Sequence, residues 1–274
     1  MNYQQLVGEI KRKQSFLCVG LDTDLKKIPP HIREKADDPV FEFNKAIIDA
    51  TLDYAIAYKP NLAFYEALGV EGLKSLEKTI QYINSRAFTI ADAKRGDIGN
   101  TAEMYAHAFY NQYGFDSITL SPYMGADTVE PFLKHKDKWS IILALTSNPG
   151  ADDFEMLKID EDYLFEKILK TFSTAATSQQ VMFVVGATRP QYFEIVRKHA
   201  PDNFLLVPGI GAQGGSLEEV CRYGLNSNTG LIVNSSRQII YAGSGTDFDE
   251  KAASQAKQIQ QQMKQILVEF KITG

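Results

Sequence analysis

Cysteine is scarce in this chain of 274 residues, and the two that occur, Cys18 and Cys221, lie far apart. Their spacing fits neither a disulfide framework nor a zinc site, so we expect buried thiols in a reducing compartment. No apolar run approaches the ~20 residues of a membrane helix, and the segment 1–13 lacks the apolar stretch of a secretion signal. We therefore expect a cytoplasmic protein with no membrane partner.

Positive charge is not in excess either. The chain holds 29 Lys and Arg against 34 Asp and Glu, which gives a net charge of −5. It thus has no general basic field for the phosphates of a duplex, and we expect no nucleic-acid partner. A hydrophobic content of 44% and a charged content of 23% exclude a disordered or fibrous chain. No linker or low-complexity segment interrupts the sequence, so we expect one domain over 1–274.

Eight short apolar segments typical of β-strands alternate with segments typical of helices. The expected strands are Phe16–Leu21, Ala55–Lys59, Phe88–Asp92, Ser117–Leu120, Ile141–Leu145, Val181–Val185, Phe204–Val207 and Leu231–Asn234. The expected helices are Pro39–Leu52, Val70–Asn84, Thr101–Tyr113, Ala126–Lys134, Asp162–Ser173, Pro190–Lys198, Ser216–Tyr223 and Phe248–Phe270. Eight such units close a (β/α)₈ TIM barrel, whose typical size is ~250 residues. The alternative, an open doubly wound sheet, usually carries G-x-G-x-x-G after its first strand, and that motif is missing here.

Two consecutive segments near the end of the chain indicate a phosphate site. Pro208–Ser216 holds four glycines, which let a backbone approach an anion, and Arg237 follows the last expected strand. Taken alone, the glycine-rich segment is compatible with an ordinary flexible turn, and Arg237 is compatible with a surface salt bridge. Barrel phosphate sites, however, use the loops after strands 7 and 8 and a nearby helix N-terminus. Together the two segments favour a phosphorylated small substrate.

The third expected strand carries charges toward one end of the barrel. Side chains alternate with period two in a strand, so Asp92 and Lys94 are expected on the interior face. Two buried charges indicate either a structural ion pair or a functional site. Asp97, taken alone, is better explained as the N-cap of the helix near Thr101.

Charges also end the two preceding strands. Lys59 ends the second strand, and the alternative is a lysine that reaches solvent. Asp22 ends the first strand, and the alternative is a turn residue. The carboxyl ends of neighbouring barrel strands converge, so these residues are expected to meet Asp92 and Lys94. Alternating carboxylates and ammonium groups beside a phosphate site indicate an active site.

These residues carry a family resemblance. Asp92–Thr101 fits the signature D-x-K-R-x-D-I-x-x-T of the orotidine 5′-phosphate decarboxylases. Other motifs follow in that family's order: Gly20-Leu21-Asp22, Lys59-Pro60, Leu145-Thr146-Ser147, Pro208-Gly209-Ile210-Gly211-Ala212-Gln213-Gly214-Gly215 and Ser236-Arg237. The chain resembles the family over nearly its whole length, and its long segment after Asp22 looks most like the longer, type 2 bacterial branch.

The resemblance implies decarboxylation of orotidine 5′-monophosphate to UMP, the last step of de novo pyrimidine synthesis, without metal or organic cofactor. It implies that Lys94 donates the proton to C6 of the pyrimidine and that Asp92 lies against the substrate carboxylate. Lys59 and Asp22 are then expected to bind the ribose hydroxyls.

The resemblance also assigns residues beyond the charged strands. It implies that Asp97, Ile98 and Thr101 reach into the active site of a second subunit, which predicts a homodimer with shared active sites. The remaining substrate-binding positions it implies are Ser147 at the pyrimidine, Gln213 and Arg237 at the phosphate, Ser236 beside them, and Pro208 near the departing carboxylate.

Two alternatives remain open at this point. A Mg²⁺-dependent sugar-phosphate decarboxylase of the same superfamily also carries a D-x-K-x-x-D strand, but it is expected to place a metal-binding carboxylate at the end of strand 1 or 2. Here Lys59 ends strand 2, which argues against that enzyme. A non-catalytic sensor of a phosphorylated ligand would bind nucleotide without turnover.

Overall fold

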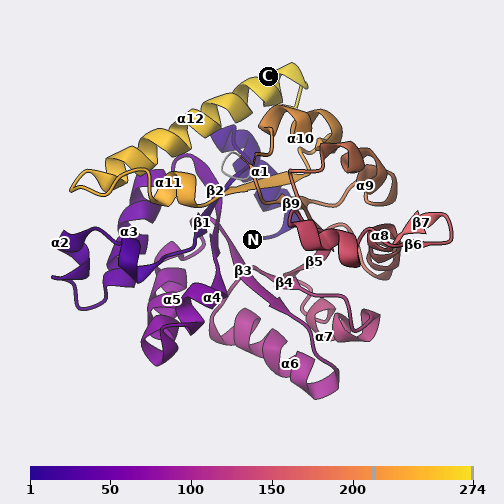
Figure 1. Ribbon diagram of the computed structural model, residues 1–274, viewed down its shortest axis with the longest axis horizontal. Coiled ribbons are helices and arrows are strands. Elements are labelled where there is room, and N and C mark those ends of the chain that lie inside the picture. Colours follow the sequence, from indigo (N-terminus) through magenta and orange to yellow (C-terminus); the bar gives the residue numbers. More distant parts are fainter. Residues whose placement is uncertain (211–213, 273–274) are drawn as a thin grey trace.

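The computed structural model describes residues 1–210 and 214–272. Its eight parallel strands form a closed barrel in the order β1-β10-β9-β8-β5-β4-β3-β2, with helices around the outside (Figure 1). The barrel strands are β1 (Leu17–Leu21), β2 (Ala55–Pro60), β3 (Phe88–Arg95), β4 (Ser117–Leu120), β5 (Trp139–Leu145), β8 (Val181–Val185), β9 (Leu205–Val207) and β10 (Leu231–Ser235). The predicted (β/α)₈ TIM barrel is therefore confirmed.

The helices cover the barrel and alternate with its strands. They are α1 (Tyr3–Lys13), α2 (Pro30–Arg33), α3 (Pro39–Thr51), α4 (Leu62–Glu66), α5 (Gly69–Ile83), α6 (Gly99–His107), α7 (Glu130–Leu133), α8 (Leu164–Ala175), α9 (Phe193–His199), α10 (Leu217–Gly224), α11 (Arg237–Ile240) and α12 (Phe248–Glu269). Each of the eight expected helices has a counterpart, whereas α2, α4 and α11 were not expected. No helix among residues 1–210 and 214–272 is both long and apolar enough to cross a membrane.

The segment between β5 and α8 contains short elements of its own. A 3₁₀ turn at Pro149–Asp153 is followed by a two-stranded antiparallel ribbon, β6 (Lys158–Ile159) and β7 (Asp162–Tyr163). The expected helix Asp162–Ser173 consequently begins at Leu164.

The strands are apolar on both faces because the barrel interior covers one face and the helices cover the other. All five residues of β1 and of β8 are buried. At the amino-terminal end of the barrel, Trp139 packs against the rings of Tyr3, Phe88 and Phe204. These rings close the amino-terminal end of the barrel interior.

The barrel closes where the first strand meets the last. Leu17 pairs with Val233 and Val19 with Ser235, and α12 packs across the join against α3 and α11 (Figure 1). Cys18 and Cys221 are both buried and free, as predicted.

Candidate active site

Three neighbouring strands deliver four charged side chains to the carboxyl end of the barrel. We call Asp22, Lys59, Asp92 and Lys94 the charged array. Lys59 Nζ donates a hydrogen bond of 2.6 Å to Asp92 Oδ2, and Lys94 Nζ donates to Asp92 Oδ1. One carboxylate therefore bridges two ammonium groups, and the predicted convergence of these strand ends is confirmed for them.

Lys59 and Asp92 stay ionised although both are buried. Burial pushes the pKa of Asp92 upward, but the nearby ammonium groups of Lys59 and Lys94 outweigh it and lower the pKa to about 2. Burial likewise acts to lower the pKa of Lys59, but the carboxylates of Asp92 and Asp22 prevail and raise it. The side chains of Lys59 and Asp92 are only 6% and 11% exposed, whereas that of Lys94 is 52% exposed. Lys94 is thus the member of this ion-pair chain that can meet both ligand and water.

The end of β3 departs from the expected alternation. Between Ala91 and Arg95 the chain advances four residues, while its partner β4 advances two, from Ile118 to Leu120. This β-bulge places Lys94 in the left-handed region, with φ of 48°. Lys94 therefore reaches the rim of the barrel through the bulge and not by regular alternation, and its ammonium group returns to Asp92.

The segment after β9 turns back on itself beside the array. Gly209 has φ of 95° and Gly214 φ of 86°, and Gly215 N donates to Gly209 O at 3.1 Å. The helix α10 follows at once, with Ser216 as its N-cap. Positive φ favours glycine, which accounts for two of the glycines of the segment, Gly209 and Gly214. The predicted phosphate ligand Gln213 lies outside the described residues.

Arg237 and Ser236 lie at the end of β10, close to the end of β1. Arg237 is the exposed first residue of α11, and it makes no ion pair with the residues that the structure describes. A surface salt bridge therefore does not account for Arg237 there. Any side chain on Gly20 would overlap Ser236 Oγ, so the glycine lets β1 and the start of the segment after β10 come together.

A cavity of about 180 Å³ joins three members of the charged array, Asp22, Lys59 and Asp92, to the segments that follow β9 and β10. Six of the predicted site residues line it: Asp22, Lys59, Asp92, Pro208, Ser236 and Arg237. Its wall also contains Gly209 and Ile210 of the predicted glycine-rich segment, and residues that the sequence analysis missed, namely Asn61, Asn234, Ser235 and Gln238. Their positions offered a signal, because most of them lie within two residues of Lys59, Pro208 or Arg237.

Buried polar atoms at this cavity lack partners within the described chain. Asp22 Oδ1, Asn234 Oδ1 and Ser235 Oγ are buried without a hydrogen bond to residues 1–210 or 214–272. Buried polar groups are normally paired, so three such atoms in one wall indicate a site for a polar ligand. These atoms are a carboxylate oxygen, an amide oxygen and a hydroxyl oxygen. All three can accept a hydrogen bond from a hydroxyl group of a ligand.

Five predicted site residues do not line this cavity within the part of the chain that the structure describes: Lys94, Asp97, Ile98, Thr101 and Ser147. Lys94 nevertheless reaches the wall through its hydrogen bond to Asp92. Asp97 is not a helix N-cap, the alternative considered for it alone, because α6 begins at Gly99 with Ile98 as its cap residue. Instead Asp97 Oδ1 accepts a hydrogen bond from Ile98 N at 2.8 Å. Ser147 follows β5 at the same end of the barrel, in close contact with Gly186.

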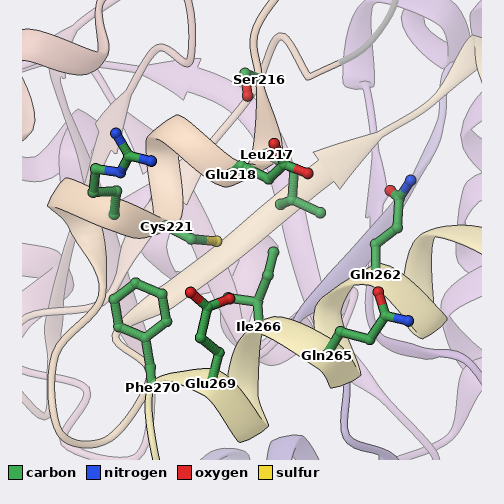
Figure 2. Close-up of a pocket in the computed structure, with 10 residues that line it drawn as sticks. Ser216, Leu217, Glu218, Cys221, Gln262, Gln265, Ile266, Glu269 and Phe270 are labelled. Carbon is green, nitrogen blue, oxygen red and sulfur yellow. The ribbon is translucent and has the colours of Figure 1, made fainter.

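A second cavity, of about 500 Å³, lies in the outer layer between α10 and α12 (Figure 2). Glu218 and Cys221 line it from α10, and Gln265, Ile266 and Glu269 line it from α12. None of the charged array reaches it, so it is separate from the candidate active site. No group of three or more His, Cys, Asp or Glu side chains within residues 1–210 and 214–272 is arranged to hold a metal ion.

Comparison with known proteins gives consistent matches over the whole barrel. The sequence model of the "Orotidine 5′-phosphate decarboxylase / HUMPS family" matches residues 15–251. An orotidine 5′-phosphate decarboxylase of Flavobacterium johnsoniae is 59% identical over 97% of this chain and 98% of its own length. One from Bacteroides fragilis is 58% identical over 96% of this chain and 97% of its own length. The solved structure of Leishmania donovani OMP decarboxylase is 34% identical, with a TM-score of 0.80 over 95% of this chain and 99% of that one.

Proposed function

Since the chain belongs to the orotidine 5′-phosphate decarboxylase / HUMPS family, we propose that its charged array carries out the family's reaction with Lys94 as the proton donor. The chain converts orotidine 5′-monophosphate to UMP and CO₂, in pyrimidine biosynthesis. The observation that supports these residue roles best is the carboxylate of Asp92, held between two ammonium groups in the wall of a polar cavity.

Lys94 serves both halves of the reaction. When the bond between C6 and the carboxylate breaks, CO₂ leaves and the electron pair stays on C6. An ammonium group fixed beside that carbon stabilises the developing negative charge. The proton of Lys94 Nζ then forms the new bond to C6. Because half of the Lys94 side chain is exposed, water can return a proton to it for the next turnover.

Asp92 and Lys59 hold that ammonium group in place. Asp92 remains a carboxylate at neutral pH and accepts a hydrogen bond from the ammonium group of Lys94. It also lies where the substrate carboxylate is expected. Lys59, buried and charged, fixes Asp92 from the other side and, with Asp22, offers partners for the ribose hydroxyls. The array thus needs no rearrangement at the moment of reaction.

The phosphate is expected at the far side of the cavity. Arg237 supplies a guanidinium fork, with Ser236 and the backbone around Gly209 beside it, and Gln213 is proposed as a further ligand. Pro208 lines the cavity wall near the departing carboxylate, and Ser147 is proposed to contact the pyrimidine. Binding energy from this remote group can be used to hold the reacting carbon against Lys94.

A homodimer with shared sites is part of the proposal. Large apolar side chains are exposed after three consecutive strands at the same end of the barrel: Ile98 after β3, Tyr123 after β4 and Phe154 after β5. Burying them against a second copy would remove apolar surface from water. It would also carry Asp97 and Thr101 toward the neighbouring site, where we propose that they contact substrate.

Subunit complementation tests the shared site. Lys94→Ala and Asp97→Ala chains, each inactive alone, are dissociated, mixed and reassociated. A hybrid dimer then has one intact site, so random mixing is expected to restore about a quarter of wild-type activity. No recovery from a mixture shown to contain hybrid dimers would contradict the shared site.

The reaction itself is tested by the loss of orotidine 5′-monophosphate absorbance after adding chelator-treated protein. We expect turnover without added metal, and none with Lys94→Ala, although that variant still binds UMP. A requirement for Mg²⁺ would favour the sugar-phosphate decarboxylase alternative. Binding of UMP by the wild-type chain without turnover would favour the sensor.

A further inference from the structure

We propose that Thr119 is a positioning residue for decarboxylation, and that its hydroxyl group holds the β3 bulge that presents Lys94. The inference rests on the proposed role of Lys94 as proton donor. Thr119 lies in β4, adjacent to β3, and is 1% exposed. Thr119 is therefore buried behind the charged array.

The Thr119 hydroxyl is fully used by the bulge. Its Oγ1 accepts hydrogen bonds from Ala93 N at 3.0 Å and from Lys94 N at 2.9 Å. Its proton has two acceptors in reach, Asp92 Oδ1 at 3.3 Å and Ala91 O at 3.5 Å. A hydroxyl has one proton and two lone pairs, so this geometry uses all three.

The bulge needs such a partner because it breaks the regular ladder. In a parallel pair, the backbone N–H groups of β3 would meet carbonyl groups of β4, but two extra residues lie between the paired positions here. The N–H groups of Ala93 and Lys94 are taken up by one side chain instead. That side chain also supports a lysine backbone in the left-handed region, which residues other than glycine rarely adopt.

The same hydroxyl therefore fixes both ends of the Lys94–Asp92 pair. It binds the backbone from which the Lys94 side chain starts, and it lies within reach of the carboxylate oxygen on which that side chain ends. Without it, the ammonium group can shift relative to C6. Misplacement by about 1 Å is enough to slow a reaction by ~10²-fold.

The deciding variant is Thr119→Val, which keeps the shape of the side chain and removes the hydroxyl. We expect kcat to fall by about 100-fold, with the KM for orotidine 5′-monophosphate and the affinity for UMP little changed. The phosphate and ribose contacts come from other strands, so binding should survive. We expect Thr119→Ser, which keeps the hydroxyl, to restore most of kcat.

Thr89→Val is the matched control. Thr89 lies in the first half of β3, and its buried hydroxyl also serves two partners, accepting from Asp116 N at 2.8 Å and donating to Asp116 Oδ2 at 3.1 Å. It is remote from the array. We expect Thr89→Val to lower thermal stability without lowering kcat, which separates a loss of stability from a loss of positioning.

Three outcomes would overturn the inference. They are a folded Thr119→Val with kcat close to wild type, a raised KM at unchanged kcat, and a Thr119→Ser as slow as Thr119→Val. If Thr119→Val does not fold, Thr119→Cys replaces it, because a thiol fills the space but accepts hydrogen bonds weakly. A wild-type kcat in Thr119→Cys would then overturn the inference. Lys94→Ala is assayed alongside: activity in that variant would refute the proposed proton donor, whereas an inactive Lys94→Ala with a fully active Thr119→Val refutes only the role of Thr119.

Discussion

Asp92→Asn tests how strongly the charged array is coupled to the stability of the barrel. The substitution keeps the size of the side chain and removes the charge, which leaves the buried ammonium group of Lys59 without the carboxylate 2.6 Å away. Removing one partner of a buried ion pair typically costs about 3–5 kcal/mol. We expect a loss of this order in the free energy of unfolding at pH 7, a large part of the ~5–15 kcal/mol that stabilises an ordinary protein.

The same ion pair predicts a pH dependence. The pKa of Asp92 is about 2 in the folded chain and 3.8 ordinarily, a depression worth about 2 kcal/mol. A depressed pKa stabilises the fold above the ordinary pKa, and that contribution disappears as the pH falls through the folded value. The stability difference between wild type and Asp92→Asn is thus expected to narrow by about 1 kcal/mol between pH 6 and pH 3.

Urea unfolding followed by the fluorescence of Trp139, the one tryptophan in the chain, measures both effects. Glu103→Gln is a suitable control, because Glu103 pairs with Lys134 at 2.8 Å on the surface, where solvent screens the charges. The reasoning is refuted if Asp92→Asn is no more destabilising than Glu103→Gln, or if its difference from wild type stays constant from pH 6 to pH 3.

Two other substitutions probe the phosphate side of the cavity. Arg237→Ala is expected to weaken UMP binding by about 10- to 100-fold, because it removes charge-assisted hydrogen bonds. The free energy of unfolding is expected to change little. An unchanged affinity for UMP in calorimetry would contradict this role. Gly20→Ala is expected to destabilise the fold by about 1–3 kcal/mol because its methyl group would overlap Ser236 Oγ. Gly8→Ala, in a helix with open space at that position, is expected to be neutral or stabilising in the same melting experiment, and equal melting temperatures for the two variants would refute the overlap.

The sequence predicted the barrel and most of the array because both depend on local patterns. Apolar runs marked all eight strands, and β4 and β8 have the predicted bounds. Charges at the ends of parallel strands must meet at one edge of the barrel, which is why Asp22, Lys59 and Asp92 were found together.

The bulge in β3 could not be predicted, because its cause lies on another strand. Period-two alternation holds only while the ladder is regular, and the hydroxyl of Thr119 supplies an alternative partner for the backbone. Asp97 shows the same limitation. Its spacing fits a helix cap, yet α6 begins at Gly99 without it. Asn61 and Asn234 were missed because an asparagine at the end of a strand does not by itself indicate a ligand contact. Only the neighbouring residues of each one point to the site.

The pairing of β1 with β10 also determines when the molecule can assemble during translation. Leu17 pairs with Val233, so 233 − 17 = 216 residues separate the two partners. At ~5–20 residues per second, a ribosome needs roughly 10–40 s to make that stretch. During this interval the nascent β1 has no β10 to pair with, and an unpaired strand edge can bind another chain. Because the ring is closed by its two ends, the barrel is completed only after the last strand has emerged.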